Sequence, residues 1–101
     1  MNKKEEILIE KAQNGDAQAM LDLGRYYYFP LNDYEKAFNY YHHAANVENQ
    51  PDNPWVNIAQ SVLAKMYELG LGCDKNLELS KYYREKSKID DYRYQEIEFH
   101  K

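Results

Sequence analysis

The 101-residue chain is poor in cysteine and in long apolar runs, and each shortage excludes some classes of protein. It has one cysteine, Cys73, which excludes an internal disulfide and leaves no cysteine pair for a zinc site. Its longest apolar run near the N-terminus, Ile7-Leu8-Ile9, is too short for a signal-peptide core or a membrane span. We therefore expect a cytoplasmic protein with no membrane insertion.

The chain also lacks a basic excess. With 13 Lys and Arg against 17 Asp and Glu, the net charge is −4, and nucleic-acid binders usually show the opposite sign. We expect no nucleic-acid partner. One stretch is basic, and we interpret it as a solvated helix face, although its use as a site is left open; it contains Lys75, Lys81, Arg84, Lys86 and Lys88.

Residues that could carry chemistry are few and poorly spaced. His42 and His43 are adjacent, so on a helix their side chains diverge by about 100°. Zinc-binding histidines on a helix stand four residues apart. No base stands near Cys73 in the sequence, which favours core filling over nucleophilic chemistry. We expect no enzyme, no metal and no cofactor.

Capping residues and apolar periodicity predict five helices. They cover about residues 3–14, 17–29, 34–47, 54–69 and 77–89. Gly15 is placed to end the first helix in a left-handed conformation, and Pro30 stops the second. The sequence pattern of the C-terminal segment 90–101 fits a strand about as well as a helix, and we favour a short terminal helix there.

The second and fourth predicted helices share a pattern of small residues, leucine and tyrosine. Ala19, Leu23, Gly24 and Tyr27 align with Ala59, Leu63, Ala64 and Tyr67 at an offset of forty residues. The third and fifth helices also align, because the pair Tyr40-Tyr41 matches Tyr82-Tyr83 at an offset of forty-two. Helix pairs that recur at this period are typical of a helical solenoid.

These residues resemble the Sel1-like repeat, most specifically in Tyr67-Glu68-Leu69-Gly70-Leu71-Gly72. The first unit departs from that pattern: Pro30 replaces the first loop glycine and the loop is about three residues shorter, as in the related tetratricopeptide (TPR) repeat. The resemblance implies an all-α fold, a short right-handed α-solenoid of two helix pairs. We expect one domain over 1–101, with an N-terminal helix (3–15), repeat 1 (16–47), repeat 2 (53–89) and a C-terminal cap or tail (90–101).

In both families the first helices of the repeats line a concave face, so the resemblance implies a protein-interaction module that binds a partner peptide or protein there. A helical wheel places two strips on that face, and the candidate partner-binding residues are Leu21, Arg25, Tyr28, Ser61, Lys65 and Glu68. Coverage of the first strip by the first helix or the tail is equally open. Exposed Tyr and Arg side chains are favoured interface anchors.

Two other functions remain open at this point. The small size and acidity also suit an inhibitor or immunity-type protein that neutralises one enzyme or toxin. A homodimer through the terminal helices is the other alternative, because two repeats leave exposed ends.

Overall fold

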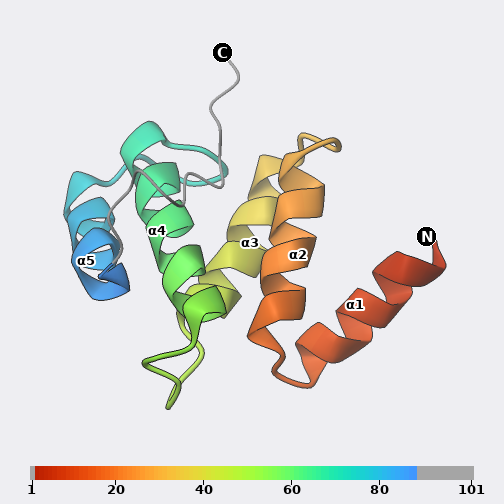
Figure 1. The fold of residues 1–101 in the computed structure, drawn as a ribbon. Helices are drawn as coiled ribbons and strands as arrows, with labels where there is room; N and C mark the ends of the chain where they lie inside the picture. The colour runs from red at the N-terminus through yellow and green to blue at the C-terminus, as the bar shows by residue number, and fades with distance from the viewer. Residues whose placement is uncertain (1, 89–101) are drawn as a thin grey trace.

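Residues 2–88 are described by the structure, a computed structural model, and they form an all-helical fold (Figure 1). The helices are α1 (Lys3–Gln13), α2 (Ala17–Tyr28), α3 (Tyr34–Ala45), α4 (Pro54–Leu69) and α5 (Leu77–Ser87). The predicted helices are therefore confirmed, with ends that differ by no more than two residues, the usual uncertainty of fraying termini. The predicted cap or tail at 90–101 lies outside the described residues.

Each of the last four helices begins at an N-capping side chain. Asp16, Asp33, Asn53 and Asn76 accept hydrogen bonds from backbone N–H groups in the first turn, at 2.9–3.2 Å. These groups have no partner inside the helix, so the caps fix the starting points. Because the caps are local, the helix boundaries could be read without knowing the tertiary structure.

The helices pack in chain order: α1 on α2, α2 on α3, α3 on α4 and α4 on α5, and α2 also touches α4. Figure 1 shows α2 and α4 side by side and pointing the same way, with α3 between and behind them. The core lies among these three helices, where Leu23, Leu63 and Tyr41 are almost entirely buried. Gly24 lets α2 approach α3 closely, because a Cβ there would lie 3.0 Å from the Tyr41 ring.

Each of the two helical hairpins, α2–α3 and α4–α5, contains the same backbone hydrogen bond at the equivalent position. The N–H of Asp33 donates to the carbonyl of Tyr27 at 2.8 Å, and the N–H of Asn76 donates to the carbonyl of Tyr67 at 2.9 Å. In each hairpin the donor is the N-cap of the second helix. The same tyrosine position therefore anchors the start of the second helix in both, although the segment from the tyrosine to the N-cap is three residues longer in the second hairpin.

The extra residues of the second loop include Gly70 and Gly72, which have φ angles of 71° and 70°. Glycine adopts this left-handed backbone without the steric cost that other residues meet. Gly72 also lies against the start of α3, since a Cβ on it would be 2.0 Å from the carbonyl oxygen of Tyr34. The second hairpin's loop is thus seated on the first hairpin.

The fourth helix is the central element, because it packs on α2, α3 and α5. Its buried residues include two polar ones, Gln60 and Ser61, both less than a tenth exposed. The amide nitrogen of Gln60 donates to the carbonyl of Ala45 in α3 at 3.0 Å. In the α4–α5 contact, the Ser80 hydroxyl donates to the carbonyl of Ala64 at 2.7 Å. Buried polar side chains therefore join α4 to both neighbours, Gln60 from α4 to α3 and Ser80 from α5 to α4.

Candidate functional site

The predicted strip on α2 is only partly accessible. Arg25 and Tyr28 are half-buried, and the Arg25 guanidinium lies 3.2 Å from the Asp22 carboxylate. Leu21 is fully buried within the core cluster. Its predicted place on an accessible strip is therefore wrong: α2 is enclosed by α1, α3 and α4, and Leu21 belongs to the core between them.

The predicted strip on α4 is reduced in the same way. Ser61 is buried, which corrects its predicted place on the accessible strip, whereas Lys65 and Glu68 are half-buried. The Glu68 carboxylate lies 2.7 Å from the Arg84 guanidinium of α5 and 3.8 Å from the Lys65 ammonium. Sequence reasoning missed Arg84 as a member of this charge cluster, because only the packing of α5 on α4 brings it there. The sequence feature that could have pointed to Arg84 is its place in the basic stretch of the fifth helix.

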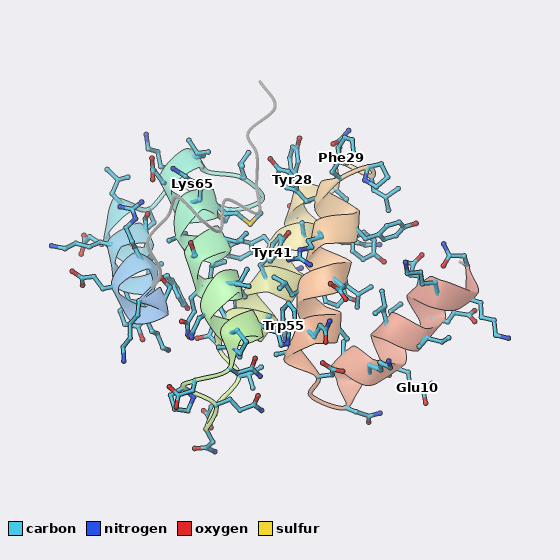
Figure 2. All side chains as sticks on the ribbon, viewed as in Figure 1. Glu10, Tyr28, Phe29, Tyr41, Trp55 and Lys65 are labelled. Atoms are coloured by element: carbon cyan, nitrogen blue, oxygen red, sulfur yellow. The ribbon has the colours of Figure 1, made fainter. Side chains whose placement is uncertain are left out.

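The four accessible residues, Arg25, Tyr28, Lys65 and Glu68, form what we call the α2/α4 face. Figure 2 shows Tyr28 and Lys65 near the same end of the two helices, with Tyr41 filling the space between α2 and α4 at a deeper level. Tyr41 is only 1% exposed, so it supports the α2/α4 face from beneath.

Aromatic side chains continue the α2/α4 face beyond the end of α2. The Tyr28 ring lies 5.1 Å from the Tyr34 ring, and burial followed by the nearby Tyr34 raises the pKa of Tyr28. Phe29 lies beside Tyr28 at the end of α2 (Figure 2). Phe29 is 63% exposed, and Leu31 in the loop is 48% exposed. The aromatic run at 26–29 therefore leaves aromatic surface exposed at Phe29.

A second feature, which sequence reasoning did not find, is an open groove of about 660 Å³ lined by α1, α2 and α3. Its apolar lining includes Ile9 of α1, Met20 and Tyr27 of α2 and Tyr40 of α3. The rings of Tyr27 and Tyr40 are stacked, with centroids 5.6 Å apart and planes within 1° of parallel. The groove depends on the angle at which α1 leaves α2, which no periodicity reports.

Polar groups surround the Tyr27 ring at this groove. Its hydroxyl donates to the Glu5 carboxylate at 2.7 Å, and the Lys36 ammonium lies 5.2 Å from the ring centroid. The hydrogen bond to Glu5, with burial and the carboxylate's charge, raises the pKa of Tyr27 to about 12. Tyr27 thus stays a neutral donor that ties α1 to α2 at ordinary pH.

The residues considered for catalysis or metal binding do not come together. The rings of His42 and His43 are 6.5 Å apart and nearly perpendicular, and burial, then the charge of His43, lowers the pKa of His42. The Cys73 thiol donates to the carbonyl of Met66 at 3.6 Å, and burial, then Asp74, raises its pKa. A raised pKa leaves less of the nucleophilic thiolate at neutral pH. Within residues 2–88, no three His, Cys, Asp or Glu side chains are grouped as a metal site requires.

No helix among the described residues is both long and apolar enough to span a membrane. Comparison of the chain with models of protein families, with curated proteins and with solved structures found no match.

Proposed function

We propose that this chain is a protein-binding module of the helical-repeat type, and that its partner docks on the α2/α4 face. The Sel1-like character of the two hairpins is part of the proposal. Supporting it are the shared N-cap bond to Tyr27 and Tyr67 and the contact between α2 and α4. The likeness is incomplete, because Tyr27 stacks on Tyr40 whereas Tyr67 stacks on Tyr83, the other member of its aligned pair.

One observation carries the proposed docking face: aromatic surface and charged groups meet at one end of two parallel helices. Tyr28 and Phe29 supply the rings, and Lys65 supplies a charge at the same end of the neighbouring helix (Figure 2). Arg25 and Glu68 add charges on the same two helices. Tyr and Arg dominate the residues whose truncation weakens protein interfaces. Rim charges add orientation and association rate more than affinity.

The test is capture of the partner with charge-reversed variants. The full chain, tagged and purified, is incubated with extract of its own cells as wild type, as Arg25→Glu/Lys65→Glu and as Lys75→Glu/Lys81→Glu. Both double variants change the net charge by the same amount, but Lys75 and Lys81 lie outside the α2/α4 face on exposed positions. Circular dichroism and thermal melting establish that all three are folded.

We expect a stoichiometric partner with the wild type and with the Lys75/Lys81 control, and its loss with the Arg25/Lys65 variant. Equal capture by all three would overturn the α2/α4 face as the docking surface. The affinity of the recovered pair then distinguishes two roles: a micromolar dissociation constant fits an adaptor, whereas a nanomolar or tighter one fits a neutralising inhibitor.

A further inference from the structure

The short loop that joins α2 to α3, residues 29–33, lies at the outer end of the first hairpin (Figure 1). Phe29 has the largest exposed fraction, 63%, of any large hydrophobic side chain in residues 2–88, and Leu31 is 48% exposed. Pro30 between them is also exposed. We call these three residues the apolar tip. Scattered apolar side chains on a surface are ordinary, whereas three consecutive exposed ones on one loop are typical of an interaction site.

The backbone of the apolar tip is held on both sides. The N–H of Phe29 donates to the carbonyl of Arg25 at 2.9 Å, and the N–H of Asp33 donates to the carbonyl of Tyr27 at 2.8 Å. Directly after the loop, the Tyr34 ring packs on the end of α2, and the loop of the second hairpin lies against the Tyr34 carbonyl. The tip is therefore anchored to the ends of two helices. A preorganised loop loses less conformational entropy on binding than a mobile one.

The α2/α4 face beside the apolar tip is filled from beneath by the chain's own side chains. Tyr41 fills the space between α2 and α4 and is 1% exposed (Figure 2). Leu63 and Met66 of α4 are fully buried. Since this space is occupied, the protruding group at this end of the molecule belongs to this chain, and the matching hollow belongs to the partner.

We propose that the apolar tip inserts into an apolar pocket of a folded partner protein, with the Phe29 ring as the buried anchor and Leu31 at the rim of the pocket. An extended peptide cannot enclose a protruding ring, whereas a pocket in a folded domain covers most of the surface of the group that it binds. Aromatic side chains in desolvated pockets dominate the binding energy of protein interfaces. The inference rests on the proposed function, because it names the kind of partner that docks at this end of α2.

Insertion of the apolar tip also bears on the role of the chain. A pocket that holds the Phe29 ring cannot hold its own ligand at the same time, so binding of this chain blocks the pocket. An adaptor would instead receive a protruding segment from its partner. The insertion therefore favours the neutralising inhibitor over the adaptor.

The test places a photoreactive p-benzoylphenylalanine at position 29 of the full chain, expressed in its own cells. The same group at position 82 is the matched control, because Tyr82 is also an exposed aromatic residue but lies on α5, with the Lys86 ammonium 5.4 Å from its ring centroid. After irradiation, mass spectrometry identifies the cross-linked residue of the partner. We expect position 29 to cross-link one protein, at a residue that lines an apolar pocket of a folded domain, and position 82 to leave that protein unlinked.

The affinity for the cross-linked protein then measures the contribution of the ring. Phe29→Ser should weaken binding about 30-fold or more, the loss that a buried aromatic anchor causes. Phe29→Leu keeps an apolar side chain and should weaken binding less than about tenfold, and Tyr82→Ser should leave it unchanged. Circular dichroism checks that all three variants are folded, as expected for exposed positions. A small-molecule ligand of the partner's pocket should compete with the wild-type chain.

Several outcomes would overturn the insertion. They are cross-linking from position 29 to no protein, to lipid alone, or to a partner segment outside any folded domain, and equal affinities of Phe29→Ser and Tyr82→Ser. If Arg25→Glu/Lys65→Glu abolishes binding while Phe29→Ser does not, the α2/α4 face stands and the insertion alone is wrong. If the wild type captures no partner at all, the proposed function fails and the insertion fails with it.

Discussion

The loop between α4 and α5 provides a sharp test of how the two hairpins are joined. Gly70 and Gly72 have nearly the same left-handed backbone angle, with φ of 71° and 70°. Their surroundings differ. A Cβ on Gly70 would meet its nearest neighbour, Lys75, at 3.5 Å, an ordinary contact, whereas a Cβ on Gly72 would lie 2.0 Å from the Tyr34 carbonyl oxygen. Replacing each glycine by alanine therefore separates backbone strain from collision with α3.

The magnitudes follow from this difference. A residue with a Cβ in the left-handed region costs about 1–2 kcal/mol, and this cost applies to both variants. Forcing an added methyl group into a packed site costs about 1–3 kcal/mol more, and this applies to Gly72→Ala alone. We expect Gly70→Ala to lower the free energy of unfolding by about 1–2 kcal/mol and Gly72→Ala by about 2–5 kcal/mol. The larger loss is a substantial part of a stability of about 5–15 kcal/mol.

Urea unfolding followed by far-ultraviolet circular dichroism measures both losses. The denaturant dependence of the unfolding free energy must be the same in both variants for the comparison to hold. In thermal melts of a domain this size, each 1 kcal/mol corresponds to a midpoint shift of about 4–8 °C. Equal losses in Gly70→Ala and Gly72→Ala would refute the reasoning, since they would mean that the loop is not seated on Tyr34.

Three further predictions concern burial and protonation. Leu21→Ala should lower the free energy of unfolding by about 3 kcal/mol, because the side chain is fully buried; a loss below about 1 kcal/mol in urea would contradict its place in the core. Glu5→Gln should lower the pKa of Tyr27 from about 12 toward its ordinary 10, measured by NMR of labelled tyrosine rings. Since the Tyr27 pKa is raised in the folded state, its contribution to stability is complete below pH 10 and is lost as the pH rises toward 12, and Glu5→Gln should weaken that loss. The His42 pKa is lowered in the folded state, so its contribution is present above pH 6.5 and is lost as the pH falls below that value; His42→Gln should show a smaller loss of stability in acid than the wild type.

The helices could be predicted because their signals are local. Asp33 and Asn76 each cap a helix through a bond within the first turn, and Gly70 ends α4 in the left-handed conformation that favours glycine. None of these depends on distant residues. The difference in loop length between the hairpins was also visible, and the bonds from Asp33 and Asn76 back to the matching tyrosines show how both lengths close onto the same position.

The candidate site could be predicted only in part, because its accessibility depends on how many neighbours each helix has. The helical wheel placed Leu21 and Ser61 on the same strips as Arg25 and Lys65, and its periodicity was sound. A helical wheel gives the direction in which a side chain points, but it does not show whether another helix covers that side chain. Leu21 points toward a packed interior and Ser61 lies on the most enclosed helix, so only the longer side chains of each strip reach the surface.

The groove lined by α1, α2 and α3 could not be predicted either, because it also depends on which helices are neighbours. The repeat pattern aligned Tyr27 with Tyr67, but part of the surroundings of each ring comes from the helix before it, which the alignment does not describe. For Tyr67 that helix is α3, which belongs to the first hairpin and supplies Phe38. For Tyr27 it is α1, which precedes the aligned pairs and supplies the Glu5 carboxylate instead of a ring. The first hairpin therefore keeps the tyrosine of the repeat without a ring from the preceding helix, and the ring that meets Tyr27 edge-on is Tyr26 of its own helix. Such an interruption is visible in the sequence once one asks what each aligned residue would touch in the preceding helix.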